Sequence, residues 1–476
     1  MRILPVLFLH LSLLCLIPKA FSTHNRAGDI TYKYISNLTY EITVTTYTKE
    51  SSQADRCELE IYFGDGDSAA VQRTNGITSG SCAPAGMGVS VANAVDIKMN
   101  IYSCMHTYPN MGTYLIHMQD PNRNGGTLNI PNSINSPFHI ESLLVIGFCP
   151  TNSIQFSSAP VLELPKTSLS PICRQNVGVT LFNNDSITFE LVACMEDSGT
   201  SCLGYTFPPG LTLNRISGEM TWNTDSLQIG QYDIAIKVSE WRNGILVGYV
   251  LRESQIDVYA SGDPRPFFSG ISGWNSGPFG YTYSLTPGNS FSISLTYKNL
   301  TGSILALTPY GEAFSLMPKA TFTTQAFGSD SIQGQFSWTP DVSEGRSQPY
   351  ILTFRGASNG SSGTTTTDIT LLLYVNGNNP VACQVTDVHW ERERNAAQLS
   401  LFPNPASDKL VLKTTKEINS SVSLLLSNAL GQLVWVKKNV QANTEISIDR
   451  SKLLRGLYFY ELRNSEFRET GKILIE

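Results

Sequence analysis

Short runs that alternate between apolar and polar residues fill most of this chain, and they constrain its fold more than any other feature. Two examples are "LTYEITVTTYT" at 38–48 and "YDIAIKVSE" at 232–240. Alternation places successive side chains on opposite faces of a strand, so each run can bury one face. Clusters of Asn, Gly, Ser and Pro separate the runs, and long stretches with the helical period are missing. The sequence therefore predicts an all-β protein built from tandem β-sandwiches.

The composition agrees with this fold class and excludes one class of partner. Only 15% of the 476 residues are charged, whereas 20 are Tyr and 21 are Phe. Aromatic residues suit pleated surfaces, so this is the composition of β-rich extracellular modules. The net charge is -6 and no basic cluster occurs. Because binding to a phosphate backbone needs such a cluster, we expect no nucleic acid partner.

The first 22 residues have the pattern of a secretory signal peptide. Met1 and Arg2 give a positive start, an apolar run of 15 residues follows, and Ala20 and Ser22 supply the small residues of a cleavage site. The run is too short to span a membrane, and no other segment reaches about 18 apolar residues. We therefore expect Sec export to the periplasm and a chain that is not a transmembrane protein.

The cysteines predict disulfide bonds. Nine occur in the chain, and Cys15 lies within the signal peptide, which leaves an even number. An even number of cysteines in a secreted chain is typical of a disulfide framework, but its connectivity cannot be read from sequence. Cys194 and Cys202 are close enough for a local hairpin staple and are the one pair that we predict. No Cys-x-x-Cys occurs, so a structural zinc site is not expected.

A repeated fragment marks two tandem modules. Residues 218–225 and 334–341 share the spacing Gly-x-x-x-Trp-x-x-Asp, and an alternating strand follows each copy. Such internal similarity indicates modules of one type. Trp222 and Trp338 occupy matched strand positions, which favours a role as core plugs over stacking on sugar rings.

Breaks in the alternating pattern divide the chain into modules. "SGDPRP" at 261–266 is a predicted joint, and the mixed charges of 391–394 cancel, so a solvated linker is expected there rather than a binding patch. The predicted parts are a signal peptide (1–22), a first sandwich module (23–160), a second module (161–260), a third module (261–377), a linker (378–398) and a small terminal unit (399–476).

The terminal unit carries sequence motifs in a fixed order. They comprise Pro403, Asn404 and Pro405, then Gly431 and Gln432, then Gly456 and Tyr458, and finally Lys472. In this order and spacing the unit resembles the type A C-terminal sorting domain of type IX secretion. The resemblance implies a small β-sandwich that the outer-membrane export machinery recognises. It also implies that the remaining protein is released or linked to a surface glycolipid.

The first module contains a second set of motifs. "IYFGDGDSA" at 61–69 is followed by "HTYPNMGTYLIHM" at 106–118. These segments resemble the polycystic-kidney-disease (PKD) domain family, although Tyr62 stands where that family often has Trp. In the second module, "FPPGLTLNRISGEMTW" at 207–222 and "GQYDIAIKVSE" at 230–240 resemble an immunoglobulin-like module related to cadherins. Both resemblances imply β-sandwiches.

Two interpretations of the acidic residues are open. Asp65 and Asp67 in the PKD-like turn, and Asp225 and Asp341 in the repeats, could bind Ca²⁺, since hard cations prefer clustered carboxylates. Glycines beside short acidic residues are also what a tight turn demands. No bidentate Glu follows Asp65 at ligand spacing, so the turn is the favoured interpretation. No other cofactor is expected.

The motifs favour a binding function over a catalytic one. The histidines form no pair at metal-ligand spacing, and no Gly-x-Ser-x-Gly elbow occurs. We therefore expect a non-enzymatic protein, secreted or on the outer cell surface after translocation across the outer membrane, that acts in adhesion or as a surface scaffold. Its expected partners are the type IX export machinery and either a glycan or an extracellular protein.

Two alternatives stay open. A carbohydrate-binding accessory protein would present Trp274, Tyr281 and Tyr283 as an exposed aromatic platform, and Trp274, in a glycine-rich run, is the candidate ligand contact. A hydrolase with an unrecognised site would instead need converging carboxylates or a Ser–His pair.

Overall fold

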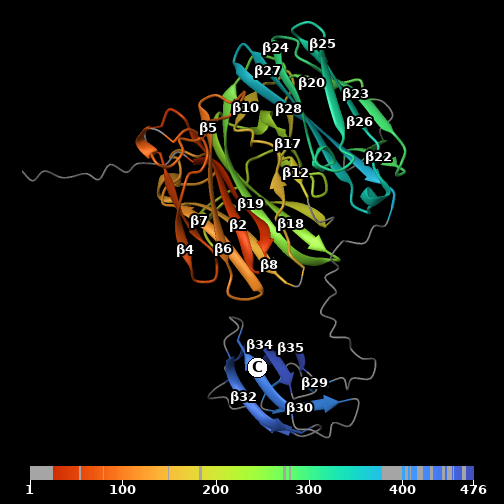
Figure 1. Cartoon of the computed structure of the whole chain (residues 1–476). Helices are drawn as coiled ribbons and strands as arrows, with labels where there is room; N and C mark the ends of the chain where they lie inside the picture. Colours follow the sequence, from red (N-terminus) through yellow and green to blue (C-terminus); the bar gives the residue numbers. More distant parts are fainter. Residues whose placement is uncertain are drawn as a thin grey trace, which may run out of the picture. The chain divides into compact units, whose positions relative to one another are not determined.

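The chain forms two compact units, residues 1–385 and 386–476 (Figure 1). The computed structural model describes residues 25–52, 55–78, 80–147, 149–181, 185–271, 275–277, 280–377, 399–402, 406–407, 409–414, 422–428, 433–441, 445–447, 453, 455–463 and 468–475. These residues form β-strands and a few short 3-10 turns, so the all-β prediction is confirmed. No helix in this part of the chain is long and apolar enough to cross a membrane.

Strands of the first module form two halves that face each other across a shared core. The strands are β1 (Asn25–Ser36), β2 (Thr39–Lys49), β3 (Glu58–Tyr62), β4 (Ser68–Gln72), β5 (Val89–Ser90), β6 (Ile97–Thr107), β7 (Gly112–Asp120) and β8 (Phe138–Ile146). One half has the order β4-β3-β7-β8 and the other β1-β2-β6-β5. Ile30 and Ile42 from one half meet Ile61 and Ile116 from the other in a core that excludes water.

The second module is built from shorter strands and one long hairpin. The strands are β9 (Gln155–Phe156), β10 (Glu163–Lys166), β11 (Ile172–Asn176), β12 (Val179–Thr180), β13 (Ser186–Val192), β14 (Met195–Asp197), β15 (Thr200–Ser201), β16 (Leu211–Leu213), β17 (Glu219–Asn223), β18 (Gly230–Arg242) and β19 (Ile245–Ala260). A three-stranded sheet, β11-β17-β16, packs against the β13-β18-β19 strands. Asn243 and Gly244 connect β18 to β19 with positive φ angles, as the Asn-Gly pair of a tight hairpin requires.

Strand β19 joins the first module to the second. One edge of β19 pairs with β18, while the other pairs with β8 at Gly248 and with β1 at Ser254. With 16 residues, β19 is long enough to reach both halves of the first module. The strands predicted as two sandwiches, 23–160 and 161–260, therefore share one continuous sheet.

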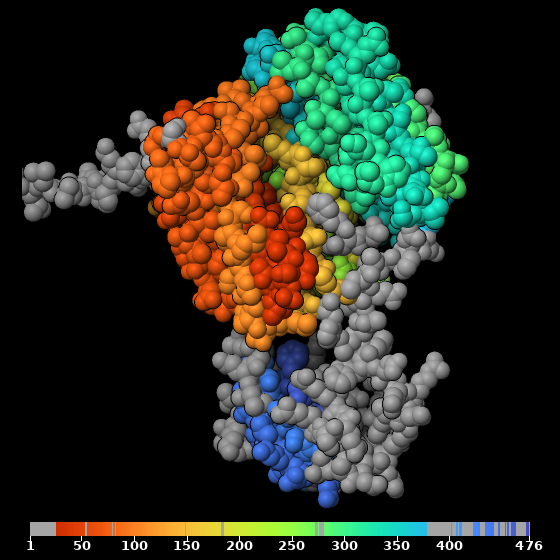
Figure 2. Space-filling model, viewed as in Figure 1, coloured from red at the N-terminus to blue at the C-terminus, as the bar shows by residue number. Residues whose placement is uncertain are grey.

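The third module is a sandwich of two sheets, β20-β23-β26-β25 and β21-β22-β28-β27-β24. Its strands are β20 (Phe267–Ser269), β21 (Asn275–Gly277), β22 (Gly280–Leu285), β23 (Phe291–Lys298), β24 (Ser303–Tyr310), β25 (Thr321–Ala326), β26 (Ser331–Trp338), β27 (Tyr350–Gly360) and β28 (Gly363–Val375). In Figure 2, yellow residues of the second module lie between the orange first module and the green-to-cyan third module.

The repeated tryptophans pack in the same way in both modules. Trp222 and Trp338 are 2% and 3% exposed, and each indole N–H donates to a proline carbonyl. The ring of Trp222 meets Tyr232 edge-on, and the ring of Trp338 meets Tyr350 edge-on. The prediction that both tryptophans fill module cores is confirmed, and the tyrosine that follows each copy of the repeat is part of the same packing.

The terminal unit is a small sandwich of two sheets, β29-β30-β33 and β32-β31-β34-β35. Its strands are β29 (Leu399–Phe402), β30 (Lys409–Thr414), β31 (Val422–Ser427), β32 (Leu433–Val440), β33 (Glu445–Ser447), β34 (Gly456–Arg463) and β35 (Arg468–Ile475). Leu410, Leu424, Leu462 and Ile473 are among the side chains that fill its core. The predicted linker, 378–398, lies outside the described residues.

Candidate functional site

The Gly-Asp-Gly segment of the first module forms a tight turn between β3 and β4. The Phe63 N–H donates to the Asp67 carbonyl at 3.0 Å, which closes the turn. Gly64 and Gly66 adopt φ angles of 86° and 102°, a region that side chains other than glycine rarely enter. The Asp67 N–H donates to Asp65 Oδ1 at 3.1 Å, so the carboxylate braces its own turn.

The second oxygen of Asp65 ties this turn to β6. Asp65 Oδ2 shares a hydrogen bond of 2.7 Å with His106 Nε2, and the His106 ring stacks on Phe63 with centroids 3.9 Å apart. Burial acts to raise the pKa of Asp65, but the hydrogen bonds from His106 and from the Asp67 N–H outweigh it, so the pKa is lowered. Both oxygens are thus used to hold the turn.

The potential ligand atoms of Asp65, Asp67 and His106 lie within 4.8 Å of one another. The His106 bond and the Asp67 bond already occupy Asp65, which is the arrangement that a structural turn needs. Ca²⁺ binding by Asp65 and Asp67 stays a prediction.

The two acids of the repeats lie at short 3-10 turns in separate modules. Asp225 is exposed in the turn Thr224–Ser226, where its N–H donates to Asn223 Oδ1. Asp341 caps the turn Val342–Glu344: its carboxylate accepts from the Val342 N–H at 2.6 Å, and the Glu344 carboxylate accepts from the Asp341 N–H. Ca²⁺ ligation by Asp225 or Asp341 likewise stays a prediction.

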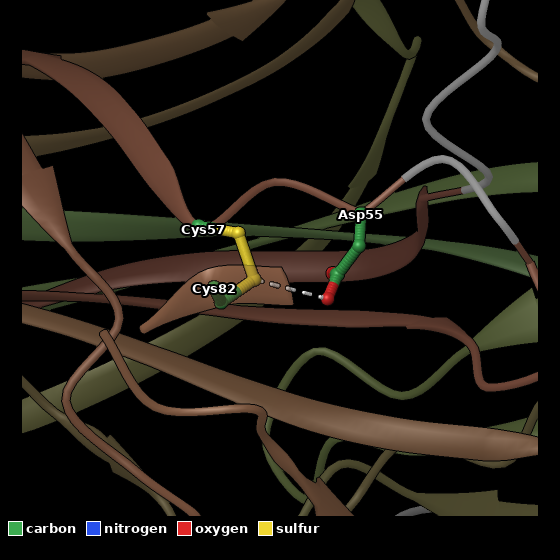
Figure 3. A group of neighbouring side chains, drawn as sticks. All are labelled: Asp55, Cys57 and Cys82. Atoms are coloured by element: carbon green, nitrogen blue, oxygen red, sulfur yellow. Dashed lines mark hydrogen bonds between the residues drawn. A yellow bond between two sulfur atoms is a disulfide. The ribbon is translucent and has the colours of Figure 1, made fainter. Parts of the chain in front are cut away.

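A second cluster of potential ligands surrounds a disulfide bond that ties the segment before the first PKD-like motif to the insertion between the two motifs (Figure 3). Cys57 and Cys82 are bonded, and Asp55 Oδ2 lies 3.5 Å from the Cys82 sulfur. Arg73 and Lys98 both form ion pairs with Asp55, and the Arg73 side chain has no exposed area. Because both sulfurs are bonded to each other, this cluster is structural. The sequence carries no signal that singles out this cysteine pair.

The predicted disulfide between Cys194 and Cys202 is not formed. Both cysteines are free and buried. The Cys202 N–H donates to the Cys194 carbonyl at 2.8 Å, so the two residues are joined through the backbone. The Cys202 sulfur instead accepts a hydrogen bond from Ser136. Burial raises the pKa of the Cys194 thiol well above its usual range, which favours the neutral thiol over the thiolate that attacks disulfides.

Of the predicted aromatic platform, the structure describes Tyr281 and Tyr283, so the platform stays a prediction. Tyr281 and Tyr283 are two residues apart on β22, and both are half-buried. The ring of Tyr283 packs on Phe291 with centroids 4.5 Å apart, whereas Tyr281 lines an open cleft. Trp274 lies outside the described residues.

Buried charge pairs hold the first module against the second. Arg252 on β19 donates to Asp29 on β1 at 2.6 Å, and both side chains are at most 4% exposed. The Arg252 guanidinium also donates to the Ser158 carbonyl and stacks on Phe156 at 3.6 Å. Such pairs are costly to break because removing one partner leaves a charge buried alone.

A similar pair holds the third module against the second. Arg355 donates to Asp368 at 2.8 Å within the third module, and its remaining N–H groups reach the carbonyls of Ala159 and Asn176. The Asn176 N–H donates back to Asp368 Oδ2 at 2.7 Å. The joints between the three modules are therefore locked by buried, geometrically specific contacts. No sequence pattern pointed to them, because each joins segments that are far apart in the chain.

The structure places part of the predicted sorting motif. Gly456 begins β34, Tyr458 is buried in the core of the terminal unit, and Lys472 pairs with Phe459 between β35 and β34. Pro403, Asn404, Pro405, Gly431 and Gln432 lie outside the described residues.

Comparison with known families identifies the terminal unit. Residues 400–476 match the family described as secretion system C-terminal sorting domain, which confirms the predicted type IX sorting domain. No curated protein matches the chain.

Several solved structures of repeated β-domains resemble the chain at low similarity. Mouse clustered PcdhgC3 EC1-3 has 11% identity and a TM-score of 0.18, with 60% of this chain and 88% of that one covered. Dscam1 isoform 4.4, N-terminal four Ig domains, has 11% identity and a TM-score of 0.16, with 95% and 100% covered. The Pseudomonas aeruginosa CupB2 chaperone has 11% identity and a TM-score of 0.15, with 42% of this chain and 99% of that one covered. Because these TM-scores are low, the arrangement of the modules is described here from the strand pairings of the chain itself.

Proposed function

We propose that this chain, whose residues 400–476 form a type IX secretion sorting domain, acts outside the cell as a non-enzymatic adhesion or scaffold protein. The sorting domain implies recognition by the export machinery and delivery to the cell surface or beyond it. The proposed partner there is a glycan or an extracellular protein.

The locked joints between modules are the observation that carries this proposal. The first two modules share strand β19, and buried pairs such as Asp29–Arg252 and Arg355–Asp368 reinforce both joints. A protein whose modules are fixed in this way keeps its binding surfaces at set positions, which suits presentation and load-bearing better than hinge-like closure around a substrate.

The chemistry of the clustered acids supports a binding role over a catalytic one. Asp65 is engaged by His106, and Asp55 is engaged by Arg73 and Lys98. A general acid or base must be free to exchange a proton with substrate, whereas these carboxylates are committed to contacts within the fold.

Export is tested by removing residues 399–476 in the native host. The truncated chain should accumulate in the periplasm, while the full chain reaches the surface or the medium, as followed by fractionation and immunoblotting. As a matched control, a periplasmic reporter fused to residues 399–476 should be carried out of the cell. Normal secretion of the truncated chain would contradict the export step.

The adhesive or scaffolding role is tested in cells. A strain that lacks this chain should attach less to host matrix or form a disordered surface layer, and the full chain should restore both. Unchanged attachment and an unchanged surface layer would exclude this role while leaving the export step intact.

A further inference from the structure

A cleft of about 810 Å³ opens where the second module meets the third. One wall is the outer face of the β11-β17-β16 sheet, and the other is made by β20 and β22 together with the β28 segment 367–369. Its volume lies within the range of about 300–1,000 Å³ that is typical of small-molecule sites. We propose that this cleft binds an anionic oligosaccharide.

The first wall is polar and follows from strand alternation. Cys173 and Trp222 point into the module core, so their strand neighbours Arg174 and Thr221 face outward. Arg174 donates to Glu219 at 2.6 Å and to Thr221 at 3.3 Å. This wall therefore offers hydroxyl and charged groups beside Ile172 and Leu213, and the charges of Arg174 and Glu219 are already balanced.

The second wall is aromatic. Phe267 is 41% exposed, whereas Phe268 and Tyr281 also line the cleft but are half-buried against the core of the third module. The C–H face of a sugar ring packs on aromatic side chains, while its hydroxyl groups need polar partners such as those of the first wall. Together the two walls match a polyhydroxylated ring.

Arg265 supplies the charge that selects an anion. It lines the cleft at only 6% exposure, and it donates to the carbonyls of Pro165 and Ser170. Its Nη1 atom is buried and has no hydrogen-bond partner. Among the described residues, no carboxylate forms an ion pair with Arg265.

The lack of an ion pair sets Arg265 apart from the other buried arginines that the structure describes. Each of the others forms an ion pair with a carboxylate: they are Arg73, Arg123, Arg242, Arg252, Arg346 and Arg355. The two acids of the lining are already engaged, Asp368 with Arg355 and Glu219 with Arg174. A buried guanidinium without a counter-ion is costly, and an anionic ligand in the cleft would supply the missing charge.

The inference rests on the proposed function, since only an exported protein meets extracellular glycans. Different experiments test the cleft and the proposed function, so a failure of one can be told from a failure of the other. The probes are a uronic acid trisaccharide, a sulfated trisaccharide and a neutral trisaccharide, titrated into the purified full chain by calorimetry. We expect an anionic trisaccharide to bind at least about tenfold more tightly than the neutral one. The tighter of the two anionic probes identifies the group, carboxylate or sulfate, that meets Arg265.

Substitutions assign binding to the cleft. Arg265→Gln should weaken binding of the anionic probe about tenfold or more, and Phe267→Ala should weaken it several-fold. Arg215→Gln and Phe207→Ala are matched controls, because both side chains are exposed and neither lines the cleft. Both controls should leave affinity unchanged.

Three results would overturn the proposal: no binding of either anionic probe, equal binding of the neutral probe, or full affinity in a folded Arg265→Gln protein. If the Arg265→Gln protein fails to fold, the Phe267→Ala variant provides the test, because Phe267 is exposed. Unchanged affinity of Phe267→Ala for the anionic probe would then reject the cleft as the binding site. If the full chain is exported but binds neither anionic probe, only the proposal for the cleft is rejected. If the full chain stays in the periplasm but binds an anionic probe, only the proposed extracellular function is rejected.

Discussion

Asp65 illustrates how single residues hold the turns of this protein. Its two oxygens bond to the Asp67 N–H and to His106. The neighbouring Gly64 is equally constrained, because a Cβ atom there would lie 2.6 Å from the Leu115 backbone nitrogen. The Gly-Asp-Gly turn therefore depends on three features: the positive φ angles of its glycines, close packing against β7, and the hydrogen bonds of the Asp65 carboxylate.

Replacing Asp65 by Asn should destabilise the protein by about 1–3 kcal/mol, because a partly buried, charge-assisted hydrogen bond is lost. The pKa of Asp65 is lowered in the folded state, so this stabilisation is present above the unfolded value of about 4 and is lost as pH falls through the folded pKa. Thermal unfolding at pH 7 and at pH 3 measures both effects. The difference between wild type and variant should be largest at pH 7 and smaller at pH 3.

Asp67→Asn is the matched control, since Asp67 is exposed and its contribution to the turn is through the backbone. It should change the melting temperature little. Added Ca²⁺ should not raise the melting temperature of the wild type if the turn interpretation holds. Tight Ca²⁺ binding that disappears in Asp65→Asn would overturn that interpretation.

Strand β19 is the element on which the arrangement of the first two modules depends. It pairs with β18 on one edge and with β8 and β1 on the other. Gly248 permits this approach, because a Cβ atom there would lie 2.9 Å from the Leu143 carbonyl and closer still to the Tyr32 hydroxyl. The Tyr32 hydroxyl itself donates to the Leu143 carbonyl at 3.0 Å.

Gly248→Ala should therefore destabilise the protein by about 1–3 kcal/mol, since a methyl group forces the β8 backbone or Tyr32 to move. Gly147→Ala is the control, because Gly147 is exposed just after β8 and a Cβ atom there meets nothing within 4 Å. Melting temperatures of the two variants compare a crowded glycine with an open one. Equal stability of both variants would show that the close approach at β19 is not required.

Buried charge pairs join the three modules between residues 25 and 377. Asp29 and Arg252 are 223 residues apart in the chain, yet they meet at the joint between the first two modules. At the next joint, the Arg355–Asp368 pair is completed by the carbonyls of Ala159 and Asn176. A charge buried in this way is stable only when its own joint is closed, so each pair couples the folding of one module to the docking of its neighbour.

Asp368→Ala should cost about 3–5 kcal/mol, because it leaves the Arg355 guanidinium buried without its partner. Loosening of the joint should also expose the segment 261–266 to proteases. Unfolding monitored by intrinsic fluorescence gives the stability change, and limited proteolysis with mass spectrometry locates the cuts.

Glu190→Ala is the control at the same scale. Glu190 pairs with Lys237 at 2.9 Å on the surface, where its side chain is 61% exposed, so its loss should cost at most about 1 kcal/mol. Asp368→Ala and Glu190→Ala proteins with equal stability and equal cleavage would contradict the role given to the buried pair.

Local patterns determined the strands, the core tryptophans and the sorting domain. Alternation, turn residues and motif spacing act between neighbours in the chain, so they can be read without knowing which segments meet. Trp222 and Trp338 were predictable for this reason, because each lies at an inward position of its own strand.

Only the tertiary structure decided which distant segments pair. Nothing in the sequence of β19 states that its second edge accepts β8 and β1, or that Cys57 rather than another cysteine bonds to Cys82. Many pairings satisfy the same alternation, and the choice among them depends on the packing of whole sheets and on the cost of burying each charge alone. The sharing of one sheet by two modules and the arginine pairs at the joints therefore emerge only when the complete chain is folded.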